Sequence, residues 1–509
     1  MEKVIGLYLG SGIVVEDPEY LDVLREDVGL NLIIMGGPYK LSEEVRARNP
    51  LPGDRAPGIS LTDDDTVLRR AIDIAHSKDI DVWLGADGWH GGYRDFPDLC
   101  IKDLKGRPIT EVPEVKYAME WGLVPICPSD ERINDWFKAA YSELVRVYPV
   151  EGIDLSHMRY TSPSFFHNLF GCGCPRCARK AEQLGYNFEG MREALLDLME
   201  RLQHLDARSV REVGKLDLHL LDFLQTPDAR AVVDWFNFRA DVISENIGAF
   251  GEAVRGAVDR EIVFGTDNFP PSFALLVGHR YRDFVRSCDY TSPLLSHVDY
   301  FILSTFGAWA NLLCEWTDGL EEREALRALY NFFGYGHLSM PERIEDLGIG
   351  TWHRIPVSEK VPLLEIVEME MRKARLLNPG IVPSYPVIKG AFWPKDVVSK
   401  LVKAAWEMGY EGIIFQGTSA IVDHNPGGKG GGEVQRVARG RCGMHIYAAA
   451  RFPSALGGLR SVRIRVPEGP ASPTARRQEG GHKAQRPGVR ARLRNDNASR
   501  VRGGHRRVF

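Results

Sequence analysis

Residues 130–160, DERINDWFKAAYSELVRVYPVEGIDLSHMRY, contain the structural unit that decides the fold. The stretch Asp130–Val147 has helical periodicity and begins with acidic residues that are suited to capping a helix. The segment Gly152–Tyr160 follows after four residues and is predicted to be a strand. A helix that leads directly into a strand is the repeating unit of parallel α/β sheets.

This alternation recurs along the chain through residue 425. It predicts an α/β fold, a (β/α)8 TIM barrel over residues 1–425, rather than an open doubly wound sheet. No G-x-G-x-x-G motif follows the first strand, so the sequence gives no support to a dinucleotide-binding fold. The eight predicted strands are Val4–Gly10, Leu30–Gly36, Asp81–Asp87, Gly152–Tyr160, Glu261–Asp267, Cys288–Ser296, Tyr385–Phe392 and Gly409–Gln416.

Two parts of this pattern are irregular. Residues 161–227 are expected to form a cysteine-containing loop and a helical insertion after strand four. For strand six, residues 297–305 compete with residues 288–296, and we favour the latter because a helix-like segment follows. Helices are expected between the strands at Asp65–Ser77, Asp130–Val147, Asp228–Val258, Ser358–Leu377 and Lys395–Met408.

The composition is that of a globular protein, with 44% hydrophobic and 26% charged residues. The N-terminus lacks the basic start and long apolar core of a signal peptide, and no run approaches the length of a membrane span. We therefore expect a cytoplasmic protein with reduced cysteines and no membrane contact.

The C-terminal residues 426–509 differ from the rest of the chain. They contain 19 Lys and Arg, of which 17 are Arg, against 4 Asp and Glu. Residues 1–425 are correspondingly acidic, which argues against nucleic acid as a partner of the barrel. The tail is Arg/Gly-rich, and we expect it to be disordered. Translation out of frame, starting just after Asn425 or within GGKGGG, explains this bias better than a basic arm for an anionic partner.

Four cysteines have the spacing of a metal site. Cys172, Cys174 and Cys177 form a C-x-C-x-x-C run, and Cys127 lies upstream in ICPSDERINDW. Such a run can direct three thiolates at one ion, and Cys127 supplies the fourth ligand of a tetrahedral zinc site. Four protein ligands leave no open position, so the predicted zinc is structural and no organic cofactor is expected. The alternative is a set of reduced thiols without a metal.

Candidate catalytic carboxylates follow the predicted strands, because active sites of TIM barrels lie at the C-terminal strand ends. Asp267 ends an apolar strand and precedes a Pro-Pro loop, and Asp87 occupies the same position in GADGWHGG. Glu120 is a third candidate if its loop folds over the barrel mouth. Two such carboxyl groups are the requirement for glycoside cleavage; solvated loop acids are the alternative.

Polar and aromatic residues at the same ends are candidates for substrate binding: Trp89, His90, His157, Arg159, Tyr160, Trp393 and Gln416. Aromatic rings stack on sugar faces, although they also serve as packing under loops. Along strand four, alternation separates Asp154 from His157 and Arg159. The apolar residues do not decide which set faces the barrel axis. We favour His157 and Arg159 facing inward, which leaves Asp154 on the helix side.

The cysteine pattern, with ICPSDERINDWF before strand four and FGCGCPRC after it, resembles the glycoside hydrolase family 42 β-galactosidases. The segments VGHRYRDFVRSCDYTSPLLS and PVIKGAFW resemble glycosyl-hydrolase-like barrel families. The resemblance covers roughly 300 residues and implies a glycoside-hydrolase-like TIM barrel with a structural zinc loop. It does not extend to the catalytic glutamates of family 42. This chain has His157-Met158-Arg159-Tyr160 and Phe392-Trp393 at those two places.

These residues lead to one favoured function and two alternatives. The favoured function is a glycoside hydrolase that acts on a carbohydrate at the C-terminal mouth of the barrel by carboxylate acid/base chemistry. The first alternative is a non-catalytic carbohydrate-binding barrel. The second is a non-glycosidase hydrolase or lyase that uses His157 as its base, for which a His157–Asp hydrogen bond in the cavity would be the mark.

The composition break gives a first testable prediction. We expect limited proteolysis of the full chain to remove residues after about Asn425 and to leave a resistant body, because low-order segments are cut first. Mass spectrometry of the resistant fragment locates the cut. A tail that survives with the body, together with a loss of stability on truncation at residue 425, would contradict the prediction.

Overall fold

A computed structural model describes residues 3–52, 55–112, 124–216, 225, 228–348 and 358–422. Eight strands form one sheet in the order β6-β5-β4-β3-β2-β1-β8-β7, with every pair parallel. Parallel bridges Thr291–Ser384 and Leu294–Val387 join the two outer strands, so the sheet curves into a nearly closed barrel. The strands are β1 (Val4–Tyr8), β2 (Leu32–Gly36), β3 (Asp81–Asp87), β4 (Gly152–Ser156), β5 (Val263–Asn268), β6 (Ser292–Pro293), β7 (Val387–Lys389) and β8 (Gly412–Gln416).

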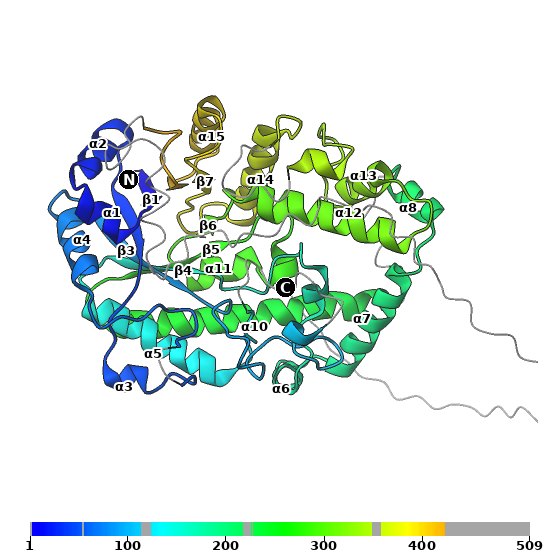
Figure 1. The fold of residues 1–509 in the computed structure, drawn as a ribbon, viewed down its shortest axis with the longest axis horizontal. Coiled ribbons are helices and arrows are strands. Elements are labelled where there is room, and N and C mark those ends of the chain that lie inside the picture. The colour runs from blue at the N-terminus through cyan, green and yellow to red at the C-terminus, as the bar shows by residue number, and fades with distance from the viewer. Residues whose placement is uncertain are drawn as a thin grey trace, which may run out of the picture. The chain divides into compact units, whose positions relative to one another are not determined.

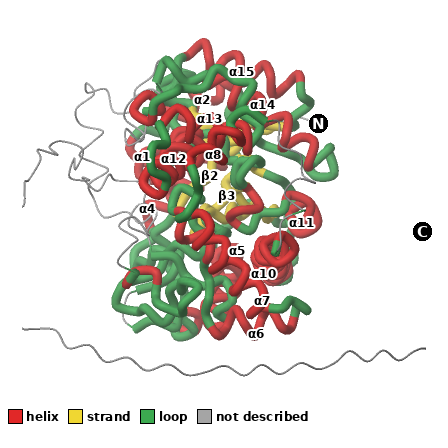
Figure 2. Tube along the Cα trace, turned by 90° about the vertical axis from the view of Figure 1, so that its right-hand side faces the viewer, coloured by secondary structure: helices red, strands yellow, loops and turns green. Residues whose placement is uncertain are grey.

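The predicted (β/α)8 barrel is therefore confirmed, and the helices surround the strands (Figure 2). Strand six lies within residues 288–296, as expected. Its competitor forms a short helix, η5 (Val298–Leu303), that continues directly into a longer one. No helix among the described residues is long and apolar enough to cross a membrane.

The outer helices begin and end close to the predicted positions. The capping role of Asp130 is confirmed, because its side chain accepts a hydrogen bond from the backbone N–H of Arg132. The helices that connect successive strands are α1 (Ser11–Glu16), α2 (Glu19–Val28), α3 (Glu43–Arg46), α4 (Thr66–His76), α5 (Glu131–Val147), α11 (Tyr281–Ser287), α12 (Ser304–Trp316), α13 (Glu322–Phe332), α14 (Leu363–Leu377) and α15 (Lys395–Glu407).

The described part of the connection from β4 to β5 contains several helices joined by loops. It contains α6 (Pro175–Gln183), α7 (Phe188–Leu202), α8 (Ala207–Val213) and the 27-residue α10 (Ala229–Arg255). Helix α10 packs against α5 and α7, whereas α8 packs against α13, which lies beside α12 (Figure 1). The predicted tail, residues 426–509, lies outside the described residues.

Aromatic rings lie in the barrel interior, beneath the C-terminal strand ends. Tyr290 lies two residues before β6, and its ring centroid is 4.7 Å from that of Trp83 on β3. Gly265 on β5 is required beside it, because an added Cβ would lie 2.2 Å from the Tyr290 ring. Rings and glycines thus occupy part of the interior, beside aliphatic residues such as Leu32 and Ile414, which flank the inward face of Gly6.

This filling places Asp154 inside the barrel. Its carboxylate accepts a hydrogen bond from the hydroxyl of Tyr290 and another, at 3.0 Å, from the hydroxyl of Tyr8 on β1. Strands β1 and β4 are not neighbours in the sheet, so the Tyr8 contact has to cross the interior. The prediction that Asp154 lies on the helix side is therefore wrong. The prediction fails because the interior around Asp154 is polar, so apolar residues do not identify the inward face of β4.

Burial raises the pKa of Asp154 to about 7, the nearby Asp267 carboxylate adds to the increase, and hydrogen bonds from Tyr290 and Tyr8 oppose it. The carboxyl is thus protonated in the folded chain over a range where the unfolded chain has released its proton. Between the pKa of Asp154 in the unfolded chain, about 3.9, and its pKa in the folded chain, about 7, only the folded chain keeps this proton. Its contribution to the free energy of unfolding is therefore lost as pH rises through this range.

We expect Asp154→Asn, which cannot ionise, to gain stability relative to the native chain as pH increases. The gain between pH 5 and pH 7.5 should be about 2 kcal/mol or more, because one pKa unit corresponds to about 1.4 kcal/mol. Urea unfolding of both proteins at the two pH values measures it. Parallel pH dependences for the two proteins would show that Asp154 does not titrate in this range.

Candidate functional site

Strand register determines which side chains reach the C-terminal mouth of the barrel. Tyr8 pairs with Gln416, which pairs with Lys389, and Asp87 pairs with Ser156. Residues in register on neighbouring strands share a face of the sheet, and Tyr8 is known to face inward from its contact with Asp154. The inward residues at the strand ends are therefore Tyr8, Asp87, Ser156, Asp267, Lys389 and Gln416.

A series of polar contacts crosses the ends of β3, β4 and β5. The Ser156 hydroxyl donates to Asp267 Oδ2 at 2.9 Å and lies 3.4 Å from His157 Nδ1. His157 Nδ1 in turn lies 2.9 Å from Asp87 Oδ1. Two of the predicted catalytic carboxylates, Asp267 and Asp87, are thus connected through one hydroxyl and one imidazole.

His157 reaches this position through its backbone. Strict alternation would turn the side chain that follows Ser156 away from the barrel axis. Instead His157 has φ of 54°, in the left-handed region that is unfavourable for non-glycine residues. The turn directs the imidazole to Asp87. Strain of this kind costs about 1–3 kcal/mol and is concentrated at functional sites.

Asp267 is the most enclosed group in the series, with 5% of its surface exposed. Burial raises the pKa of the Asp267 carboxyl, the Asp87 charge adds to this, and the charges of His157 and Arg159 oppose it. The Asp87 side chain, in contrast, is 37% exposed. Two carboxylates in one site therefore have unlike surroundings, which is the arrangement that separates the roles of acid and base.

Arg159 is buried beside this series. Its guanidinium lies 5.0 Å from the ring centroids of both Phe269 and Phe301 and donates a hydrogen bond to the Tyr160 carbonyl at 3.0 Å. Phe269 directly follows β5, and Phe301 belongs to η5, so Arg159 is held at the β5–β6 side of the mouth. Cation–π contacts on two faces fix the guanidinium in place.

Two of the predicted substrate-binding residues, Trp89 and Tyr160, do not point into the barrel mouth. Trp89 is fully buried, donates its indole N–H to Asn134 at 3.0 Å and packs on Phe137 of α5 and Phe250 of α10. Tyr160 is fully buried, and its ring lies 3.9 Å from the guanidinium of Arg239 on α10. Neither ring faces the mouth, contrary to expectation, because the helices α5 and α10 provide an apolar space beneath these loops.

The other predicted residues stay near the strand ends or lie outside the described range. The His90 ring lies 5.1 Å from that of His157. Trp393 follows β7 and is almost completely buried. Gln416 accepts a hydrogen bond from the Ser296 hydroxyl at 2.6 Å. Glu120 lies outside the described residues, so its predicted role is untested.

Three polar residues at the mouth, Ser156, Lys389 and Asp299, are not predicted from the sequence. Ser156 was assigned no role, although it connects Asp267 to His157. Lys389 lies inward at the end of β7, and Asp299 of η5 lies 3.6 Å from its ammonium group. A lysine within the otherwise apolar run YPVIKGAF was a signal that could have drawn attention to this strand end.

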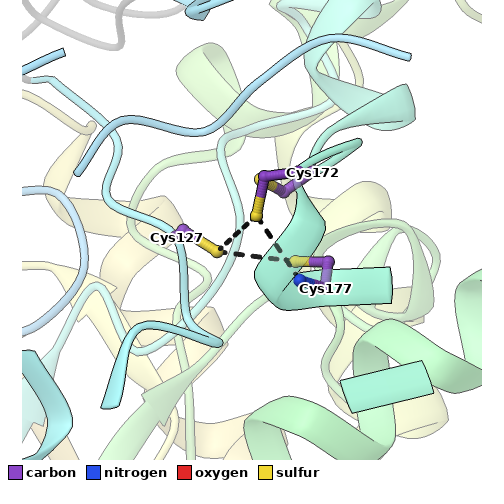
Figure 3. Close-up of side chains that lie close together, drawn as sticks. Cys127, Cys172 and Cys177 are labelled. Atoms are coloured by element: carbon purple, nitrogen blue, oxygen red, sulfur yellow. Dashed lines mark hydrogen bonds between the residues drawn. The ribbon is translucent and has the colours of Figure 1, made fainter. Parts of the chain in front are cut away.

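The four predicted metal ligands come together away from the mouth. The sulfurs of Cys127, Cys172, Cys174 and Cys177 are all buried and lie within 4.8 Å of one another. Cys127 Sγ is 3.6 Å from Cys174 Sγ and 3.4 Å from Cys177 Sγ. Figure 3 shows the sulfurs of Cys127, Cys172 and Cys177 directed toward a common point.

Backbone donors surround these sulfurs. The N–H of Lys102 donates to Cys172 Sγ at 3.3 Å, and the N–H of Cys177 donates to Cys174 Sγ at 3.4 Å, where Cys174 caps α6. Hydrogen bonds from the neighbouring thiols, that of Cys127 first, hold the pKa of Cys174 below its usual value. A compact, buried set of four sulfurs with amide donors can bind a metal ion.

Comparison with known proteins gives no family. No protein-family model matches the chain, and no curated protein matches its sequence. The solved structures that it resembles include the PgaB (BpsB) glycoside hydrolase domain of Bordetella bronchiseptica, at 8% identity over 83% of this chain and 96% of that one, with a TM-score of 0.47.

Two others are an α-L-fucosidase isoenzyme 2 of Paenibacillus thiaminolyticus and the catalytic domain of a β-amylase of Paenibacillus polymyxa. The first is 10% identical over 82% of this chain and 46% of that one, with a TM-score of 0.42. The second is 11% identical over 82% and 92%, with a TM-score of 0.40. Likenesses at this level do not identify an activity, so function has to be argued from the side chains.

Proposed function

We propose that the barrel mouth binds a carbohydrate and cleaves a glycosidic bond by carboxylate acid/base chemistry. The observation that carries the proposal is the connected series Asp267–Ser156–His157–Asp87 at the strand ends. It supplies two carboxyl groups of unlike burial on one rim, and glycoside cleavage needs two such groups.

The contacts set an upper limit on the separation of the two carboxylates, and this limit is compatible with the proposed chemistry. Contacts of 2.9, 3.4 and 2.9 Å connect Asp267 to Asp87, and the sum of these lengths is the upper limit of the distance between the bonded oxygens. That limit lies within the range, up to about 9.5 Å, over which paired carboxyl groups act on a glycosidic bond.

The difference in burial supports one assignment of the two roles. Asp267 is enclosed, and its pKa is raised, so it is the better group to hold a proton and give it to the leaving oxygen. Asp87 is more exposed and is held by the His157 imidazole, so it acts as the base or the nucleophile on the other side of the bond.

A second candidate function rests on the His157–Asp87 pair itself. A carboxylate at 2.9 Å from Nδ1 orients the imidazole and strengthens it as a base. His157 could then activate water in a hydrolysis or lyase reaction that involves no glycosidic bond. The third possibility, a mouth that binds sugars without cleaving them, would leave both carboxylates without a chemical role.

Asp267→Asn separates the favoured function from the others. The substitution keeps the shape and removes the proton donor, so turnover of a responsive glycoside should fall by about 10²–10⁴-fold, the usual contribution of a general acid. Activity on a panel of nitrophenyl glycosides measures the loss. Asp135→Asn, at an exposed position on α5, is the matched control and should keep full activity.

His157→Gln completes the comparison. If the second candidate is correct, this variant loses hydrolysis of nitrophenyl esters, whereas Asp267→Asn keeps it. Full glycosidase activity in Asp267→Asn, with an unchanged melting temperature, would remove Asp267 from the mechanism. If the native chain binds a broad glycoside panel without cleaving any member, the binding-barrel function becomes the better one.

We also propose that the four cysteines hold a structural zinc ion. Zn–S bonds of about 2.3 Å in a tetrahedron place the sulfurs about 3.8 Å apart. The measured separations of 3.4 and 3.6 Å are close to this value. Four thiolates occupy every tetrahedral position, so this ion would stabilise the loop and take no part in the reaction.

Metal analysis of the purified chain should therefore find about one zinc ion per molecule, which is lost in Cys174→Ser together with part of the free energy of unfolding. Cys288→Ser, which removes a buried thiol outside this set, is the control and should keep the metal. A native chain without metal, or a Cys174→Ser variant with full metal content, would contradict the proposal.

A further inference from the structure

The mouth has a second polar cluster on the side opposite the Asp267 series, at the ends of β7 and β8. Lys389 faces inward there and is only 4% exposed. Among the described residues, its ammonium group has a single partner, Asp299 Oδ2 at 3.6 Å. This distance exceeds that of an ordinary hydrogen bond, so the largely buried ammonium group makes no short contact in the described part of the chain.

The carboxylate of Asp299 also lacks a hydrogen-bond partner for one of its oxygens within the described residues. Its Oδ1 atom is buried and, within the described residues, accepts no hydrogen bond. The side chains of Lys389 and Asp299 are 5% and 11% exposed, so both charges are largely removed from bulk water. Buried charged groups are costly unless their hydrogen bonds are made, and such a deficit at a binding site is normally met by a ligand or by ordered water.

Gln416 provides a third group beside the pair. It is in register with Lys389, and its carbonyl Oε1 is occupied by the hydroxyl of Ser296 at 2.6 Å. This contact fixes the orientation of the amide. The two N–H donors of the amide are therefore left for another acceptor, because no described residue accepts from them.

We propose that Lys389, Asp299 and Gln416 form a binding subsite for adjacent hydroxyl groups of an uncharged sugar ring. A hydroxyl both donates and accepts, so two of them can accept from Lys389 and Gln416 and donate to Asp299 at the same time. The ion pair has no net charge, so it offers nothing to a carboxylated or phosphorylated sugar. Asp299 would instead repel such a substituent.

The position of this subsite fits the proposed reaction, on which the identification of the ligand as a sugar rests. Tyr8 is in register with Gln416 and bonds to Asp154 beneath Asp267, so both clusters lie at the same end of the barrel. Arg159 stacks on Phe301 of η5, the element that also carries Asp299. A sugar bound by Lys389 can thus extend toward Asp267 across the mouth.

Burial lowers the pKa of Lys389, and the Asp299 charge opposes the shift. Removal of either partner alone leaves the other charge buried, which destabilises the fold.

Asp299→Asn is therefore tested together with the double variant Lys389→Met/Asp299→Asn, which removes both charges and keeps the volume. Lys400→Met and Asp396→Asn remove the same groups from an exposed pair on α15 and are the matched controls.

The experiment is isothermal titration of the full chain with uncharged methyl α- and β-glycosides of glucose, galactose and mannose. Glucuronic and galacturonic acids are the charged probes. We expect at least one neutral glycoside to bind, with its affinity reduced about tenfold or more in Asp299→Asn and in the double variant, because hydrogen bonds to charged groups are lost. The controls on α15 should bind as the native chain does.

Three results would overturn the subsite. The first is that no neutral glycoside binds at about 50 mM, a concentration far above the Kd of a weak complex. The second is that the folded double variant binds neutral glycosides with unchanged affinity. The third is that the uronic acids bind more tightly than their neutral counterparts. Binding is measured without cleavage, so the two proposals fail separately. A sugar that binds through Lys389 but is never cleaved rejects only the hydrolase, whereas cleavage with a KM unaffected in the double variant rejects only the subsite.

Discussion

The left-handed backbone at His157 is the constraint on which the arrangement of the mouth depends. It ends β4 after Ser156, leaves the Ser156 hydroxyl pointing at Asp267 and turns the next imidazole to Asp87. The turn also requires a glycine directly after the neighbouring strand β3. A Cβ on Gly88 would lie 2.3 Å from the Met158 sulfur and 3.1 Å from the His157 carbonyl. One strained residue therefore positions two of the four groups in the series, the Ser156 hydroxyl and the His157 imidazole.

The cysteine cluster supports the same region from outside. Ile126, next to Cys127, donates its N–H to the carbonyl of Trp89 at 2.6 Å. Asn134 accepts from the Trp89 indole and donates to the carbonyl of Pro128, on the other side of Cys127. The loop that follows Asp87 is thus fastened to the chain that carries Cys127. A metal bound by the cysteines would hold the loop that presents His90 to His157, without contact with the reacting groups.

Local patterns predicted the fold well because each depends on neighbours in sequence. Helix α5 has acidic residues at its start and an apolar stripe, and β3 is a continuous apolar run, so both were located from periodicity. The cysteine cluster was predicted for the same reason, because three of its members, Cys172, Cys174 and Cys177, are close neighbours in the sequence. The tertiary contact with Cys127 required only the expected order of one helix and one strand.

The orientation of side chains at the mouth was not predictable in the same way. Asp154 was misplaced because tyrosine hydroxyls from β1 and β6 satisfy it inside the barrel, and neither partner is near it in sequence. Trp89 follows a strand end, as a sugar-stacking residue would, but the space between α5 and α10 receives its ring. Such outcomes depend on which distant element offers an apolar space or a hydrogen bond, and no single segment contains that information.

The two sides of the mouth have different electrostatic character, and this division follows from the strands that carry them. Strands β3 to β5 supply Asp87 and Asp267 with His157 and Arg159 nearby, a side on which charge can shift between groups. Strands β7 and β8, with η5, supply a lysine, a carboxylate and an amide that balance one another. Proton transfer needs groups whose charge changes during the reaction, whereas recognition of a neutral ligand needs groups whose charge stays fixed. Under the two proposals made above, the barrel would separate proton transfer from ligand recognition by placing them on opposite arcs of one rim.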